Sequence, residues 1–208
     1  MKLSKMDHMA FITPDLEKTI RFYRDLLGLP LETGVGHEGF RHYFFRVGDG
    51  YIAFFAYDIA QPMAYDKFHG SPTDKPIGFD HLSFTVESKE DLFAMKDKLE
   101  AAGIAVHGAV DHGLFWSIYF FDPVNNLPLE LTWNFVELTQ PQAIYDEHPL
   151  PVALEGPEPQ PGHWPEVTRP TPPERMVAHH GNGFDMRPNF LAQNKGRITP
   201  QGKAAGIR

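Results

Sequence analysis

The chain of 208 residues is long enough for one compact domain with a core, and its 42% hydrophobic and 13% aromatic content predicts that most of it folds. Its formal net charge of −8 argues against a general nucleic-acid binder, because such a protein presents a basic surface. The sequence contains no cysteine, which excludes disulfides, thiolate metal sites and a cysteine nucleophile.

The beginning of the chain predicts one strand, one helix and three further strands. Residues 7–11 are flanked by residues that favour β-structure and are expected to form a strand. A helix is expected from about residue 15 to residue 27, because Thr13 or Asp15 can cap its start and Gly28 can end it. The next strands are expected near residues 29–35, 42–47 and 51–57, with a tight turn at residues 48–50.

The same order of elements returns later in the chain. Residues 80–84 repeat the pattern of residues 7–11, and a helix is expected from about Lys89 to Ala102, with Ser88 at its start and Gly103 at its end. Strands are expected near residues 105–110, 115–121 and 128–135, with a turn at residues 122–126. These patterns predict an α+β fold of two tandem βαβββ repeats that form a cleft-shaped mixed sheet. The alternative is two unrelated βα units that both begin with aspartate and histidine.

The repeats are expected to span residues 5–58 and 79–136 of a domain at residues 1–136. The linker at residues 59–78 is longer than a minimal connection and is expected to cover the cleft as a lid. From residue 137 to residue 208 the chain is rich in proline, which predicts an extended C-terminal arm. Such a segment is either disordered or lies across a neighbouring subunit, and the recurring aromatic residues favour the second alternative.

Two histidines occupy equivalent positions in the predicted repeats. His8 lies on the first strand of one copy and His81 on the first strand of the other. A single histidine on a strand is more often a structural polar residue than a metal ligand. Two equivalent histidines predict a shared site, because two such units packed into one cleft would bring them together. Neutral imidazoles at that point suit Fe(II), Mn(II) or Zn(II).

Glu130 is the expected third ligand. It lies between two leucines on a predicted strand, where a buried carboxylate is unfavourable unless a partner such as a metal ion compensates it. The alternative is a glutamate that faces solvent. At the same separation from His8 the first copy has Tyr57, with Asp58 just beyond it. The expected set of two histidines and one carboxylate leaves coordination positions open, as is typical of non-haem Fe(II) sites.

The sequence resembles the vicinal oxygen chelate superfamily, which includes glyoxalase I, extradiol ring-cleaving dioxygenases and the fosfomycin and bleomycin resistance proteins. The resemblance covers roughly residues 5–136. It rests on residues 7–11, 22–29, 79–84, 117–123 and 129–131. It implies that the metal ligands are His8, His81 and Glu130, because the family carries its ligands on the first strand of each repeat and on the last strand of the second.

The pattern of the site is most similar to the extradiol branch. That branch has a histidine, then an aliphatic residue and a tyrosine, then an Asp-Pro pair and the glutamate, which His112, Tyr119 and Glu130 match in order. The resemblance implies that His112 exchanges protons with bound oxygen or substrate and that Tyr119 hydrogen-bonds a substrate oxygen. The sequence departs from the branch in a longer turn at residues 122–126 and in lacking one further histidine, which His69 of the linker could replace.

We therefore expect a non-haem Fe(II) ring-cleaving dioxygenase that uses O2 and a catechol-like chelating substrate, with Mn(II), Zn(II) or Ni(II) as other metals. The alternatives are a glyoxalase-like isomerase or lyase and a drug-binding resistance protein. The aromatic strands predict an apolar pocket, and His37 and His42 at its edge are expected to be exposed. The resemblance implies a homodimer. Without a recognisable signal peptide or an apolar run of about 20 residues, we expect a cytoplasmic protein with no membrane or nucleic-acid partner.

Overall fold

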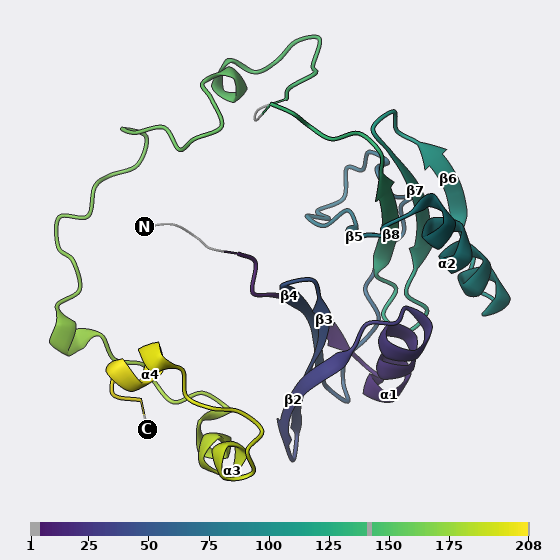
Figure 1. Ribbon diagram of the computed structural model, residues 1–208. Coiled ribbons are helices and arrows are strands. Elements are labelled where there is room, and N and C mark those ends of the chain that lie inside the picture. The colour runs from purple at the N-terminus through teal and green to yellow at the C-terminus, as the bar shows by residue number, and fades with distance from the viewer. Residues whose placement is uncertain (1–4, 141–142, 208) are drawn as a thin grey trace. The chain divides into compact units, whose positions relative to one another are not determined.

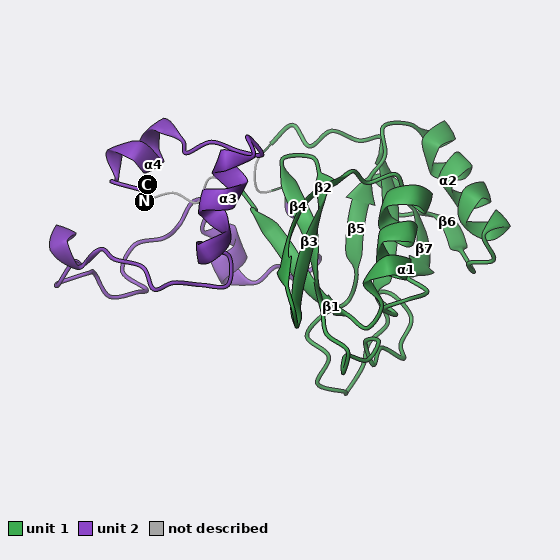
Figure 2. Ribbon diagram, turned by 90° about the horizontal axis from the view of Figure 1, so that it is seen from below, with its two compact units in different colours: residues 1–143 green, residues 144–208 purple. Residues whose placement is uncertain are grey.

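The structure is a computed structural model that describes residues 5–140 and 143–207. Residues 1–4, 141–142 and 208, which include the start of the predicted domain and parts of the predicted arm, lie outside the described residues. The chain divides into two compact units, Met1–Ala143 and Ile144–Arg208 (Figure 2). Within the described residues, no helix is both long and apolar enough to cross a membrane.

The first repeat forms one four-stranded sheet with its helix. Its elements are β1 (His8–Thr13), α1 (Leu16–Ile20), a π-helical segment (Arg21–Leu26), β2 (Leu31–His37), β3 (Phe40–Val47) and β4 (Gly50–Ala56). The strand order is β1-β4-β3-β2, with β1 parallel to β4 and the other pairs antiparallel. The sheet is therefore mixed: β2, β3 and β4 alternate in direction, and β1 runs in the same direction as its neighbour β4.

The second repeat has the same topology (Figure 1). Its elements are β5 (Leu82–Thr85), α2 (Lys89–Ala101), β6 (His107–Asp111), β7 (Phe115–Phe121) and β8 (Pro128–Asn134). The strand order is β5-β8-β7-β6, again with one parallel pair, β5 and β8. The predicted α+β fold of two βαβββ repeats is thereby confirmed, and each repeat forms a sheet of its own.

Local sequence signals explain where the helices begin and end. Asp15 caps α1, because its carboxylate accepts a hydrogen bond from the Lys18 amide at 3.0 Å. Ser88 caps α2 in the same way, accepting from the Asp91 amide at 3.0 Å. The glycine that follows the first helix, Gly28, has a φ of +82°, which a residue with a side chain rarely adopts.

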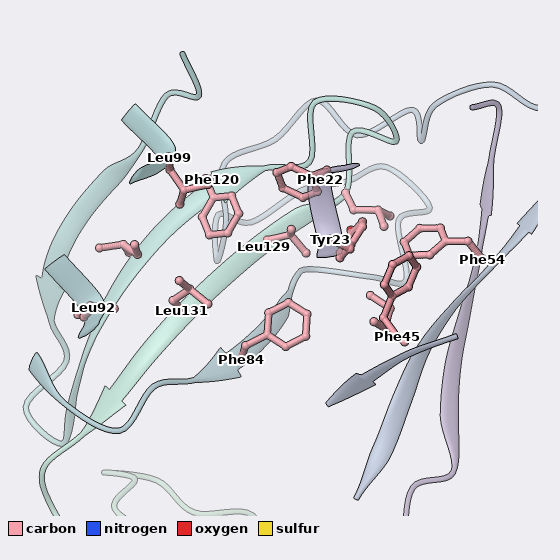
Figure 3. Close-up of a cluster of buried hydrophobic side chains, with 13 residues drawn as sticks. Phe22, Tyr23, Phe45, Phe54, Phe84, Leu92, Leu99, Phe120, Leu129 and Leu131 are labelled. Atoms are coloured by element: carbon pink, nitrogen blue, oxygen red, sulfur yellow. The ribbon is translucent and has the colours of Figure 1, made fainter. Parts of the chain in front are cut away.

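The helix-facing sides of both sheets contribute to one hydrophobic core (Figure 3). Figure 3 shows Phe22 and Tyr23 between the strands of the two repeats. The Tyr23 ring lies 4.8 Å from that of Phe54 in the first sheet, and its hydroxyl donates to Asp122 in the second repeat at 2.9 Å. Because strand side chains alternate, the opposite faces of the two sheets point away from this shared core.

The linker between the repeats lies along the second repeat. The Met63 amide donates to the main-chain oxygen of Asn125 at 2.8 Å, and the Tyr65 ring lies 5.8 Å from that of Phe121. Further along, the Lys67 ammonium forms an ion pair with Asp80. The linker is thus attached to the sheet that carries His81 and Glu130.

The unit from Ile144 onward contains only short helices among its described residues. They are the 3₁₀ segments Pro151–Leu154, Pro173–Arg175 and Phe184–Met186, and the helices α3 (Arg187–Ala192) and α4 (Pro200–Ala204). Tyr145, Trp164 and Val167 are largely exposed, and none of these helices has a buried residue. The unit does not bury its own aromatic residues, and its role as an arm across a neighbouring subunit stays a prediction.

Candidate metal centre

His81 and Glu130 face each other on the second sheet. His81 directly precedes β5, and Glu130 lies on β8, the strand paired with β5. The histidine Nε2 lies 3.0 Å from the Glu130 Oε2. Glu130 is only 5% exposed, so the expected solvent-facing alternative for this residue does not apply.

Asp80 sets the tautomer of His81. The His81 Nδ1 donates to the Asp80 Oδ1 at 2.5 Å. Burial raises the pKa of Asp80, but its contacts with Lys67, the Gly70 amide and His81 outweigh that effect and hold the pKa well below its usual range. Because the ionised Asp80 holds the proton on Nδ1, the Nε2 lone pair of a neutral His81 points at Glu130.

The chemistry of this pair fits a cation. A lone pair and a carboxylate oxygen at 3.0 Å repel each other unless a proton or a metal ion lies between them. Burial raises the pKa of Glu130, but hydrogen bonds from Ser117, Tyr119 and Ser83 outweigh it, so the pKa is lowered and the carboxylate stays ionised. A carboxylate and an imidazole held by a second carboxylate are donors that divalent metal ions prefer.

Tyr119 and His112 lie beside this pair. Tyr119 is on β7 directly opposite Glu130, and its hydroxyl lies 2.8 Å from the His112 Nε2. Burial, followed by the hydrogen bond to Glu130 and the charge of that carboxylate, raises the pKa of Tyr119 to about 12, so the phenol keeps its proton at neutral pH. The two residues expected to manage protons and the two expected ligands of the second repeat therefore come together on one face.

His8 lies on the other sheet. Its Nδ1 lies 2.7 Å from the Asp7 Oδ1, which repeats the arrangement of Asp80 and His81. Its ring lies 6.1 Å from that of His42 and 5.7 Å from that of Phe44. In residues 5–140 and 143–207, no three histidine, aspartate or glutamate side chains come together in a metal-binding arrangement. The set of three ligands therefore stays a prediction.

The strand register corrects which residue of the first repeat is equivalent to Glu130. Ser83, two residues after His81, pairs with Glu130, whereas Ala10, two residues after His8, pairs with Ala53. The equivalent residue is thus Ala53, and not Tyr57 as the chain separation suggested. The connection between β7 and β8 is longer than the one between β3 and β4, which shifts the separation. The first repeat offers no carboxylate at this position.

Two further histidines lie on these faces. His42 is 7% exposed and stacks on Phe55 with ring centroids 3.6 Å apart, so the expectation that it is exposed was wrong. Burial, followed by the charge of His8, lowers its pKa. His69 of the linker is 6% exposed and lies 5.8 Å from the His81 ring. The linker has no periodic pattern, so the signals for His69 were its residue type and the missing histidine that it could replace by resemblance.

The chain is similar to several known proteins. The family model "Glyoxalase/Bleomycin resistance protein/Dioxygenase superfamily" matches residues 5–131. The "Glutathione transferase FosA" of Serratia marcescens is 26% identical over 131 residues, which are 58% of this chain and 75% of that protein. The solved glyoxylase/bleomycin resistance protein/dioxygenase domain from Frankia sp. EAN1pec is 25% identical, with a TM-score of 0.54 over 64% of this chain and 94% of that one. FosX from Listeria monocytogenes, solved with Mn(II) and sulfate, is 19% identical, with a TM-score of 0.49 over 65% of this chain and 96% of that one.

Proposed function

Because this chain belongs to the glyoxalase/bleomycin resistance protein/dioxygenase superfamily, we propose that it is a metal-dependent enzyme that opens the ring of a catechol-like substrate with dioxygen. One observation carries the proposal. The hydrogen-bonded pair of Tyr119 and His112 lies beside His81 and Glu130 on one face of the second sheet. A chelating diol needs a metal with open positions and nearby groups that hold and move its protons.

In this proposal His8, His81 and Glu130 hold the metal. When bound, the ion would supply Lewis acidity, and Fe(II) would in addition supply the electron transfer that reaction with dioxygen requires. Ala53 leaves the first repeat without a fourth ligand, which supports a site with open positions and argues against the glyoxalase-like isomerase. Mn(II), Zn(II) and Ni(II) are the other ions that such donors accept.

We infer that a second copy of the chain completes the site. The faces that carry His8 and Glu130 both point away from the shared core, and His8 does not join the other two ligands within the described chain. In a twofold dimer, His8 of one chain would meet His81 and Glu130 of the other, and the same contact would recur in the second site. The exposed aromatic residues of the C-terminal arm would then pack on the partner.

Tyr119 and His112 have different tasks in this scheme. Tyr119 keeps its proton because burial and Glu130 raise its pKa to about 12, so it donates a hydrogen bond to a substrate oxygen. The His112 Nε2 contacts that hydroxyl at 2.8 Å; when Tyr119 donates to the substrate, this nitrogen carries a proton and donates to the Tyr119 oxygen, so His112 can pass a proton to the substrate through Tyr119 and take it back by the same route. The linker at residues 59–78 would act as the lid over these groups.

The charges of the two faces favour a phenolic substrate over a phosphonate. On the second sheet, the strand residues of the Glu130 face include no lysine or arginine: Ser83, Thr85, His107, Val110, Phe115, Ser117, Tyr119, Phe121, Pro128, Glu130, Thr132 and Asn134. On the first sheet, Arg46 is the positively charged strand residue of the His8 face. Its Nε donates to Glu32 at 2.9 Å, so its charge is already paired. A doubly charged anion would lack a strong cationic partner there.

Glutathione transfer is a second candidate, because the Serratia marcescens relative carries that activity in its name. The two candidates differ in what they consume. Protein purified without oxygen and loaded with Fe(II) is expected to take up O2 with a catechol and to form a yellow ring-fission product. Full Fe(II) occupancy without O2 uptake for any diol would overturn the dioxygenase proposal. Loss of free glutathione in the presence of Mn(II) and fosfomycin would support the transferase.

A further inference from the structure

We propose that His69, carried by the linker between the repeats, is a substrate-binding residue of the candidate metal centre. The proposal rests on the proposed function, because the substrate in question is the one held beside His81 and Glu130. Its chemical class is a metal-chelating phenol, which presents oxygen atoms that an imidazole can hydrogen-bond.

His69 is buried without satisfying its polar atoms. Its side chain is 6% exposed, and neither ring nitrogen makes a hydrogen bond in the described part of the chain. A neutral imidazole has one donor and one acceptor nitrogen, and the nearby main-chain oxygen of Phe120 does not form a hydrogen bond of good geometry with either. Burying both without partners is unfavourable, so such a group is expected to meet an ordered water, an ion or a ligand, or to serve a catalytic step.

The position of the ring points to the metal centre. Its centroid lies 5.8 Å from the ring of His81, 5.1 Å from that of Tyr119 and 4.9 Å from that of Phe121. His69 therefore joins the side chains to which the ligand and proton-handling roles are assigned. It forms no metal-binding group of three with His81 and Glu130, which favours a contact with the substrate over a contact with the metal.

Specific bonds hold the linker on both sides of His69. The Lys67 side chain, which is only 10% exposed, forms an ion pair with Asp80. The Gly70 amide donates to the Asp80 Oδ1 at 2.9 Å. Asp80 also accepts from the His81 Nδ1, so one carboxylate anchors both the metal ligand and the loop that carries His69. A loop that only covered apolar surface would not need this shared anchor.

A structural role would be served better by another residue. The ring of His69 is surrounded by the rings of Phe68, Tyr119 and Phe121. Phenylalanine would pack against these rings and bury no unpaired nitrogen. If the ring nitrogens of His69 had structural partners, replacing the residue would weaken the fold; if they bind the substrate, the fold should be unharmed and the ligand lost.

The experiment compares wild type with His69→Phe, His69→Gln and the control His37→Gln. His37 is exposed and hydrogen-bonds the main-chain oxygen of its own neighbour Glu38. Three measurements are made on the full chain: thermal unfolding without metal, Zn(II) affinity by titration, and binding of 4-nitrocatechol to the Zn(II)-loaded protein by visible absorbance. Zn(II) is redox-silent, so no turnover interferes.

We expect His69→Phe to unfold at the wild-type temperature or above it and to bind Zn(II) within about twofold of wild type. Its affinity for 4-nitrocatechol should fall about tenfold or more, as for the loss of a hydrogen bond to a charged or polarised oxygen. His69→Gln should lose less affinity, and the control should match wild type. If His69→Phe does not fold, His69→Gln is used in its place: it should fold, bind Zn(II) within about twofold of wild type and bind 4-nitrocatechol more weakly than wild type does.

Wild-type affinity for 4-nitrocatechol in a folded His69→Phe would overturn the inference, as would a lowered unfolding temperature with binding intact. Failure of the wild type itself to bind Zn(II) or 4-nitrocatechol would overturn the proposed function, and the inference with it. The two failures are therefore distinguishable.

Discussion

Replacing Tyr23 with phenylalanine would remove the hydroxyl that joins the two repeats and leave the packing of the ring intact. Tyr23 is fully buried, and its hydroxyl donates to the Asp122 Oδ2 at 2.9 Å. Asp122 keeps its other donors, among them the Asn125 Nδ2 at 2.6 Å and the Val124 amide at 2.7 Å. Because the Asp122 carboxylate keeps these hydrogen bonds, the free energy of unfolding should fall only by the contribution of one hydrogen bond to a charged group, about 1.5 to 3 kcal/mol.

The measurement is urea unfolding followed by circular dichroism, with the free energy of unfolding compared at equal slope. The matched control is Tyr43→Phe on β3, because that hydroxyl makes no hydrogen bond in the described part of the chain. The control should stay within about 0.5 kcal/mol of wild type. An equally small effect of Tyr23→Phe would refute the idea that this bond stabilises the packing of the repeats.

Two further predictions concern the second sheet. The folded pKa of Glu130 is lowered from its ordinary value of 4.5, so its ionised form stabilises the metal-free fold above that pH and ceases to do so as the pH falls through the folded value. The difference in unfolding free energy between wild type and Glu130→Gln should therefore shrink below about pH 4.5; a difference that is constant with pH would contradict the assigned contacts. Asp80→Asn should weaken Zn(II) binding about 10- to 100-fold, because Asp80 orients His81; unchanged affinity in a titration would show that it does not.

Local signals in the sequence were sufficient to predict where the helices and strands lie. The caps at Asp15 and Ser88 and the glycine after the first helix are short-range chemistry, and they place the helices within a few residues of the structure. The repeated order of elements predicted that both repeats share one topology. The structure agrees, since each repeat pairs its first and last strands in parallel. Alternation separated Glu130 from its flanking leucines, whereas Tyr119 was expected only from the resemblance, and the strand register places it opposite Glu130.

Features that depend on loop length and on packing could not be predicted in this way. Ala53, and not Tyr57, is equivalent to Glu130, because the turn before β8 is longer and chain separation no longer measures strand register. Among the described residues His8 forms no metal-binding group with His81 and Glu130, and this depends on how the two sheets pack together, which no local pattern encodes. His69 is placed by the bonds of its loop to Asp80, which the sequence of the linker does not reveal.

The claim that the metal site is shared between two chains can be tested with two inactive variants. His8→Ala and Glu130→Ala chains are refolded separately and as an equal mixture, and the metal bound per chain is measured. In a twofold dimer about half of the mixed dimers are hybrids, and each hybrid has one intact site and one doubly altered site. A shared site therefore predicts about one quarter of the wild-type metal content in the mixture and almost none in either variant alone. A mixture that binds no more metal than the separate variants would contradict it.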